Sequence, residues 1–311
     1  MADRIPGEFN INFMGHRHLA VLFSAFLLVG STAMLAVNGL KLGIDFTGGT
    51  LVELGYATPP DLDGIRATLE ASEFGDAVVQ YFGSPKDVLV RLGVSEELAT
   101  DDVSTRVLDL LPDAEMRRIE FVGPQVGEEL TEDGALAMLY ALGGILMYVM
   151  LRFTFKFSLG AIAALIHDVL VVLGFFAVTQ MDFDLPVLAA LLAVIGYSLN
   201  DTIVVFDRIR ENLNAKGGRR EDPTALVDRS INETLPRTVL TSGTTLVVLL
   251  ALLFVGGAVI RDFTLVLILG VVVGTYSSIF VASPALLEIQ KRLGDGSGDR
   301  DRKKRGARAT A

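Results

Sequence analysis

Six apolar runs most constrain how this chain can fold. A helix needs about 20 apolar residues with few charges to cross the hydrocarbon core of a bilayer. The candidate runs are residues 19–38, 135–151, 157–179, 186–206, 238–259 and 263–287. Hydrophobic residues make up 51% of the chain, which excludes an ordinary soluble enzyme. The sequence therefore predicts an α-helical integral membrane protein with six transmembrane helices. The second run is short enough that its helix can extend outward past Asp133.

Lysine and arginine are concentrated on one side of these runs. If the N-terminus is inside, the inner segments carry 19 such residues, whereas the short outer loops at 180–185 and 260–262 carry only Arg261. Because basic residues favour the cytoplasmic side, both termini are expected in the cytoplasm. The first run is longer than a secretion signal and lacks a clear cleavage site, so we interpret it as a retained anchor.

The segment between the first two runs is expected to form a small outer domain. Residues 39–134 hold 20 acidic and 7 basic residues. Apolar alternation predicts four strands, helical periodicity predicts two helices, and the turn Gly83-Ser84-Pro85 separates the middle strands. The strands are 51–56, 77–82, 88–92 and 115–122, and the helices are 62–71 and 100–111. This βαββαβ order predicts a ferredoxin-like α+β domain.

The chain is thus divided into five parts. They are a cytoplasmic N-terminus (1–18), a first span (19–38), the outer domain (39–134), a five-helix bundle (135–287) and a basic cytoplasmic tail (288–311). The composition of the end of the tail, from Gly294, predicts disorder. Its Arg302-Lys303-Lys304-Arg305 run fits the positive-inside bias and could also touch anionic lipid headgroups or ribosomal RNA. No specific nucleic-acid partner is predicted.

Several kinds of chemistry are excluded by what the sequence lacks. The chain has no cysteine, which rules out disulfides and thiolate sites. It has no phosphate-binding loop and no zinc-peptidase motif, and the outer domain has no histidine and no glycine motif that links a strand to a helix. We therefore predict no cofactor, no metal and no enzymatic reaction. The simplest energy source is an ion gradient.

Asp201 is the strongest candidate functional residue. Only His167, Asp168 and Asp201 are ionisable within the six runs. An ionised aspartate at a helix centre costs about 2.5–3.5 kcal/mol on insertion scales, so such a residue is a functional candidate by default. The polar residues that surround it in sequence are Tyr197, Ser198, Asn200 and Thr202.

Arg237 is the expected partner of Asp201. It stands at the inner mouth of the fifth run, followed by Thr241 and Ser242, at a depth that matches Asp201 on a neighbouring helix. Movement of a guanidinium toward or away from a carboxylate changes the proton affinity of that carboxylate, which suits a proton carrier. A permanent structural pair that joins two helices is an equally good interpretation.

His167 and Asp168 are secondary candidates. Adjacent residues point about 100° apart on a helix, so we do not expect these two side chains to face one cavity. Structural hydrogen bonding within the bundle is the favoured role.

Taken together, these segments resemble the SecF membrane subunits of the SecD/SecF family. The matching sequences are GIDFTGGT at 43–50, GPQVG at 123–127, HDV at 167–169, GYSLNDTIVVFDR at 196–208, TLPRT at 234–238 with Thr241-Ser242, and GTYSSIF at 274–280. The resemblance covers residues 10–290, and the motif at 196–208 is the most specific.

The resemblance implies half of an assembly in a bacterial inner membrane, related to resistance-nodulation-division transporters and completed by the six spans of SecD. It also implies proton-driven assistance to unfolded polypeptides that leave the SecYEG channel. In that family the aspartate matching Asp201 is the proton-responsive residue, and the arginine matching Arg237 acts with it. Two alternatives stay open: a proton-driven pump for small molecules or lipids, disfavoured by the small outer domain, and a passive scaffold of the export channel.

Overall fold

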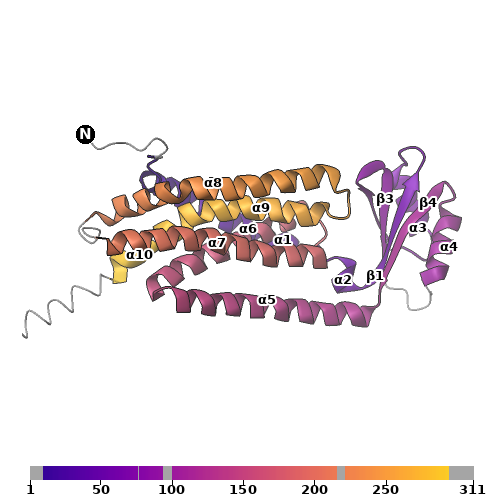
Figure 1. Ribbon diagram of the computed structural model, residues 1–311. Helices are drawn as coiled ribbons and strands as arrows, with labels where there is room; N and C mark the ends of the chain where they lie inside the picture. Colours follow the sequence, from indigo (N-terminus) through magenta and orange to yellow (C-terminus); the bar gives the residue numbers. More distant parts are fainter. Residues whose placement is uncertain (1–9, 76, 94–99, 216–220, 294–311) are drawn as a thin grey trace, which may run out of the picture.

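A bundle of long helices carries a small sheet domain at one end (Figure 1). This computed structural model describes residues 10–75, 77–93, 100–215 and 221–293, so the predicted disorder from Gly294 onward lies outside the described residues. Within them, six helices are long and apolar enough to cross a membrane. The prediction of a six-span helical protein is confirmed.

Five of the six spans are helices longer than the apolar runs that predicted them, and the last span is divided among three elements. Their bounds are α1 (Arg17–Asn38), α5 (Pro124–Arg152), α6 (Phe155–Thr179), α7 (Leu185–Asn214), α8 (Pro223–Val255) and α9 (Arg261–Ser277). A π-helical turn, η3 (Ser278–Ala282), leads from α9 into α10 (Ser283–Leu293), and a 3-10 turn, η1 (Met14–His16), precedes α1. The additional helical turns of α5, α7 and α8 consist mostly of polar residues. A search for apolar runs does not find helical segments of that composition. As expected, α5 extends outward past Asp133.

The outer domain has the predicted βαββαβ order. Its elements are β1 (Gly49–Tyr56), α3 (Leu62–Glu70), β2 (Val78–Phe82), β3 (Ser84–Leu92), α4 (Thr100–Leu110) and β4 (Ala114–Val122). The strands form one antiparallel sheet in the order β2-β3-β1-β4. Alternate residues of β1 and β3, including Val52, Leu54 and Val88, are fully buried beneath the helices. Strand β3 begins at Ser84, inside the predicted turn, because Gly83 makes the reversal with φ 74°.

The segment that enters the sheet is fixed to the outer end of the bundle. A short helix, α2 (Ile44–Thr47), precedes Gly48 and Gly49, whose φ angles are 70° and 124°. Positive φ favours glycine, and a Cβ at Gly49 would lie 2.6 Å from the carbonyl oxygen of Leu92. Just before α2, residues 41–43 run beside residues 182–184 of the α6–α7 loop. We call this contact the latch.

Backbone hydrogen bonds and one ion pair hold the latch together. The Gly43 N–H donates to the Phe183 carbonyl and the Phe183 N–H donates to the Lys41 carbonyl, both at 2.8 Å. Lys41 Nζ also lies 2.9 Å from Asp182 Oδ1. The sheet domain is therefore joined to the bundle through the latch as well as through the start of α5.

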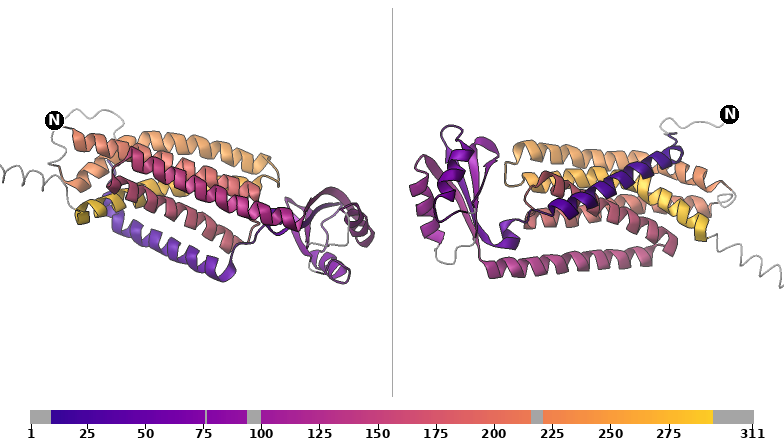
Figure 2. Two further views of the ribbon diagram at one scale, coloured as in Figure 1. Left: turned by 90° about the horizontal axis from the view of Figure 1, so that it is seen from below. Right: turned by 180° about the vertical axis from the view of Figure 1, so that it is seen from behind.

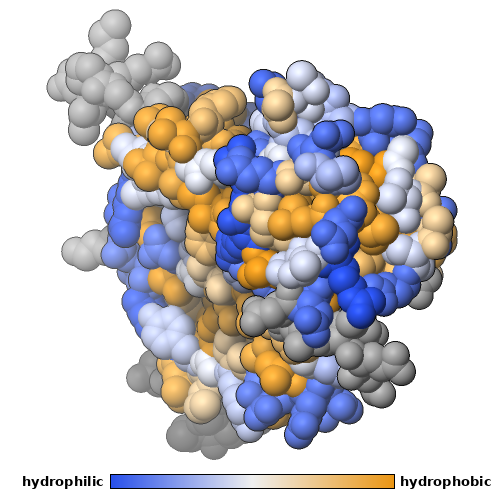
Figure 3. Space-filling model, turned by 90° about the vertical axis from the view of Figure 1, so that its right-hand side faces the viewer, coloured by the Kyte–Doolittle hydropathy of each residue, from blue (hydrophilic) through white to orange (hydrophobic). Residues whose placement is uncertain are grey.

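Helix α1 crosses one face of the bundle, and its beginning lies beside α10 at the end away from the sheet (Figure 2). Both ends of the described chain are thus at that end, as an even number of spans requires. The opposite end presents the sheet domain, where hydrophilic and hydrophobic residues are intermixed on the surface (Figure 3). Among its exposed apolar side chains are those of Val78, Tyr81 and Phe121.

Candidate functional site

Asp201 lies in the middle of α7 with 6% of its surface exposed. Two hydroxyl groups from other elements donate to its carboxylate. The Thr238 hydroxyl on α8 donates to Oδ1 at 2.7 Å, and the Ser278 hydroxyl, the first residue of η3, donates to Oδ2 at 2.6 Å. A buried carboxylate must have its oxygens satisfied, so these bonds join three helical elements at one side chain.

Arg237 does not form the direct ion pair that the sequence suggested. Its side chain is exposed on α8, and no carboxylate oxygen of the described residues lies within 4.0 Å of its guanidinium. The reason is helical geometry. Thr238 faces Asp201, and the preceding residue points about 100° away. The guanidinium remains close enough to interact electrostatically with Asp201.

His167 and Asp168 do come together, so the expectation that they would not is wrong. His167 Nδ1 lies 2.9 Å from Asp168 Oδ1, and both side chains are 1% exposed. Rotation about the side-chain bonds of histidine brings the ring over the next residue in spite of the divergence of the two Cα–Cβ bonds. Asp168 Oδ2 accepts hydrogen bonds from Ser198 and from Ser277, the latter at 2.7 Å. This network fits the structural role favoured from the sequence.

The two buried carboxylates are bonded to consecutive residues at the junction of α9 and η3. Ser277 ends α9 and donates to Asp168, whereas Ser278 begins η3 and donates to Asp201. Single π-helical turns inside α-helices are frequent at functional sites. A change at either carboxylate therefore acts on the same turn of backbone.

The predicted supporting residues fall into two groups. Tyr197, Ser242 and Thr275 form a chain from α7 through α8 to α9, with oxygen–oxygen distances of 3.4 Å and 2.7 Å. Within the part of the chain that the structure describes, the side chains of the remaining residues form no hydrogen bond with Asp201. Asn200 is exposed, the Thr202 hydroxyl is buried without a hydrogen-bond partner among the described residues, and the Thr241 hydroxyl donates to carbonyls of its own helix.

Sequence reasoning missed the three hydroxyl donors Thr238, Ser277 and Ser278. Each stands in the sequence as a small polar residue in an apolar run. Comparison of residue depths in the membrane could have found Ser278. It lies in the cytoplasmic half of the last span, and Asp201 lies in the cytoplasmic half of the fourth.

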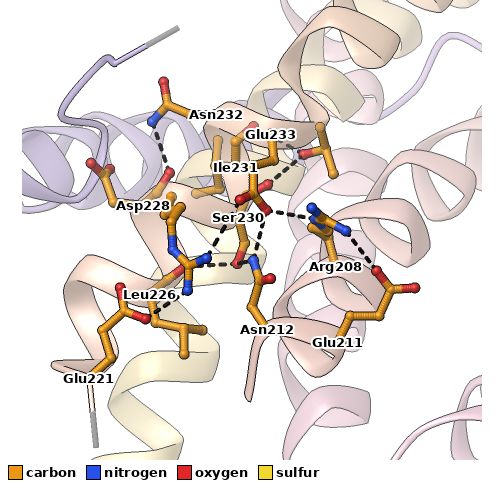
Figure 4. Close-up of polar contacts among 12 residues, drawn as sticks. Arg208, Glu211, Asn212, Glu221, Leu226, Asp228, Ser230, Ile231, Asn232 and Glu233 are labelled. Atoms are coloured by element: carbon orange, nitrogen blue, oxygen red, sulfur yellow. Dashed lines mark hydrogen bonds and ion pairs between the residues drawn. The ribbon is translucent and has the colours of Figure 1, made fainter. Parts of the chain in front are cut away.

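A polar network ties the polar extension of α8 to α7 (Figure 4), and Asn232 of the same extension binds the N-terminal segment. Glu233 accepts hydrogen bonds from Arg208 at 2.6 Å and from Asn212 at 2.8 Å. Asn232 exchanges two hydrogen bonds with the backbone of Ile11, both at 2.8 Å. Glu233 is one turn before Arg237, so the network fixes α8 next to the Asp201 site.

Comparison with known proteins identifies the family. A model described as "Protein export membrane protein SecD/SecF, C-terminal" matches residues 102–292, and one described as "SecD/SecF GG Motif" matches residues 33–60. A protein translocase subunit SecF from Vibrio alginolyticus is 48% identical, and the match covers 93% of each chain. The chain belongs to the SecF branch of the SecD/SecF family. A SecF from Magnetococcus marinus is 50% identical over 89% of this chain and 91% of its own. These relatives and the six apolar helices make the chain a multi-pass bacterial membrane protein.

A solved structure has the same fold. SecDF from Thermus thermophilus, described as a translocon-associated membrane protein, matches with a TM-score of 0.84 and 38% identity. The match covers 93% of this chain but 40% of that one. The SecF-like chain thus spans less than half of a protein in which SecD and SecF are fused, and its match to the GG motif, residues 33–60, includes residues 41–43 of the latch.

Proposed function

We propose that this SecF subunit acts with SecD to use the proton gradient to promote late translocation and release of polypeptides at SecYEG. The observation that carries the proposal is the buried Asp201 carboxylate, held by one hydroxyl from α8 and one from η3. Protonation of a carboxylate converts one of its oxygens from an acceptor into a donor. Each protonation would therefore alter contacts among three elements at once.

The position of Arg237 supports a carrier over a permanent staple. A staple needs a closed ion pair, whereas this guanidinium is exposed and bonded to no carboxylate of the described residues. It is free to approach when Asp201 loses its proton and to withdraw when the proton returns. A proton that crosses 100 mV releases about 2.3 kcal/mol, enough to shift a two-state equilibrium roughly 50-fold.

The face of α7 beside this site suits the docking of SecD. Small side chains allow transmembrane helices to approach closely. The exposed small or polar residues along this face are Ala189, Ala193, Gly196 and Asn200. We place SecD against this face and α8, so that protons cross between the two subunits. Rearrangement of α7 and α8 would then move the sheet domain, which holds and releases the emerging chain.

The orientation follows the positive-inside bias, with both termini in the cytoplasm and the sheet domain in the periplasm. The small outer domain disfavours a pump for drugs or lipids, because its pocket, which includes Tyr56 and Pro112, is open and partly polar.

Substitution of Asp201 tests the proposal. We expect Asp201→Asn to abolish the gradient-dependent part of export in energised vesicles that contain SecD and SecYEG, because an amide keeps the size but cannot take up a proton. Asp207→Asn is the matched control, since Asp207 is on the same helix and pairs with Arg152 at 2.6 Å. Full gradient stimulation in Asp201→Asn would indicate a passive scaffold. Substrate efflux without export would indicate a small-molecule pump.

A further inference from the structure

A groove of about 470 Å³ runs between α1, α6 and the η3–α10 segment, and Asp201 is not part of its lining. Its walls are mostly apolar. The apolar lining comes from α1 on one side and from η3 and α10 on the other, with Val21, Ala25 and Leu28 facing Phe280, Val281 and Ala285. At the end farthest from the mouth, the Ser24 hydroxyl forms a hydrogen bond of 3.0 Å with the Tyr276 hydroxyl, and the His167 ring forms a hydrogen bond with Asp168.

The mouth of the groove is basic. Arg17 and His18 line it from the start of α1, and Lys291 lines it from the end of α10. The acid at the mouth, Glu288, is bonded at 2.7 Å to Arg292. Arg17 and Lys291 belong to none of the ion pairs found within the described ranges, although both lie near enough to Glu288 to interact with it electrostatically. The two charges are therefore available to an anion.

The dimensions of the groove match one leaflet of a bilayer. Arg17 and Leu28 are 11 residues apart on one helix, which corresponds to about 16 Å. The hydrocarbon core is about 30 Å thick. The groove thus begins where headgroups lie, on the side that the positive-inside bias assigns to the cytoplasm, and ends near the middle of the membrane.

We propose that this groove binds one anionic phospholipid of the inner leaflet, with its phosphate between Arg17 and Lys291 and an acyl chain along Ala25 and Leu28. A guanidinium and an ammonium attract phosphate, and basic pockets between transmembrane helices on the cytoplasmic side suit such headgroups. The proposal does not depend on proton coupling.

A helix of a partner protein fits the groove less well. An apolar transmembrane helix would cover the walls of the groove but would bring no anion to Arg17 and Lys291 at its mouth. The face that we assign to SecD is formed by α7 and α8, whereas α1 packs on α6 and η3.

The groove shares a wall with the Asp201 site. Phe280 and Val281 belong to η3, and the first residue of the same turn, Ser278, donates to Asp201. A bound acyl chain would press on this turn from the side opposite to the carboxylate. The lipid is therefore placed to stabilise one arrangement of η3.

Photolabelling of the SecD–SecF complex in nanodiscs tests the proposal. The probe is phosphatidylglycerol with a diazirine on one acyl chain, and phosphatidylcholine with the same chain is the reference. We expect phosphatidylglycerol to label peptides of α1 and of η3–α10 more strongly than phosphatidylcholine does. Arg17→Gln and Lys291→Gln should each lower this labelling roughly fivefold. Ala25→Trp should block the acyl chain.

Two matched controls keep the result specific. Lys156→Gln removes a base on the same side of the membrane outside the groove lining, and Ala33→Trp adds the same bulk to an exposed site of α1. Both should label like the unmodified protein. Equal labelling by the two lipids, equal loss in controls and groove variants, or cross-links from the groove to SecD would each overturn the proposal. Arg17→Gln and Lys291→Gln change the mouth of the groove, whereas Ala25→Trp changes its apolar wall. If one of these variants fails to fold, the others still test the proposal.

Discussion

At the scale of single residues, Thr238 is the contact between α8 and the buried carboxylate. Its hydroxyl donates to Asp201, whereas the hydroxyl of Thr241, one turn along, donates to the carbonyls of Arg237 and Thr238 on its own helix at 3.0 Å and 3.1 Å. The same residue type thus serves two roles within one turn. Hydrogen bonds between transmembrane helices contribute about 0.6–2 kcal/mol, so loss of one should alter the site without unfolding the bundle.

We therefore expect Thr238→Val to reduce gradient-stimulated export while the protein still inserts and folds. Valine keeps the shape of threonine and removes only the hydroxyl. Thr241→Val is the matched control and should export normally, and Thr238→Ser should restore much of the activity. Export stimulation measured in energised vesicles checks all three. Equal effects of the two valine substitutions would mean that the bond to Asp201 carries no function.

Charged residues in apolar runs could be predicted as a site, but their partners could not. Asp201, Asp168 and His167 stand out because ionised side chains are costly within a membrane. A hydroxyl in a helix can bond its own carbonyl four residues back or reach a neighbouring helix, and sequence does not distinguish the two. Thr238 and Thr241 demonstrate this. The direct Arg237 pair was suggested by depth alone, without the rotation about the helix axis that decides which residue faces Asp201.

At the scale of elements, the beginning of α7 depends on Asp184. Its Oδ1 accepts the Val187 N–H at 2.8 Å, which caps the helix. Burial raises the pKa of Asp184, the bond to Val187 opposes this, and the nearby Asp45 raises the pKa further. An acid whose pKa is higher in the folded state than its unfolded value of about 3.9 stabilises the fold fully below that value. This contribution is lost as the pH rises through the folded pKa.

We expect Asp184→Asn to raise the unfolding temperature at neutral pH, because asparagine caps as well as aspartate and does not ionise. The gain should shrink toward zero as the pH falls below about 4, where both side chains are neutral. Asp184→Ala distinguishes the effect of the helix cap from the effect of the charge, because loss of the cap lowers the stability by about 1 kcal/mol at any pH. Unfolding curves in detergent from about pH 3 to pH 8 check this. A gain that does not change with pH would contradict it.

The elements were predictable where one physical signal dominates. Apolar runs give all six spans, and alternation gives the four strands, because both patterns follow from burial. The polar starts of α5 and α8 could not be found in this way. Their helical state is set by proline in the first turn, at Pro124 and Pro223, and by packing. The π-helical turn η3 has no sequence pattern of its own, although it holds the residue that donates to Asp201.

At the scale of the whole molecule, several contacts between described residues join the sheet domain to the bundle. The latch and the start of α5 are two of them. Another is the turn at Gly83 between β2 and β3, where a Cβ would lie 2.8 Å from the Cβ of Ala258 in the loop between α8 and α9. That loop follows the helix that carries Thr238 and Arg237. A shift of α8 in response to Asp201 would therefore reach the sheet domain directly through this contact.

A tether across this contact tests whether the domain must move. The chain has no cysteine, so Gly83→Cys with Ala258→Cys introduces a single possible pair. A disulfide needs Cβ atoms about 3.5–4.5 Å apart, which a small separation of the two loops provides. We expect oxidation to abolish gradient-stimulated export and reduction to restore it, because the closed bond holds the sheet domain against the bundle. The two single-cysteine variants control for strain at Gly83, whose φ is 74°. Undiminished export by the oxidised protein would mean that the domain acts without separating from the α8–α9 loop.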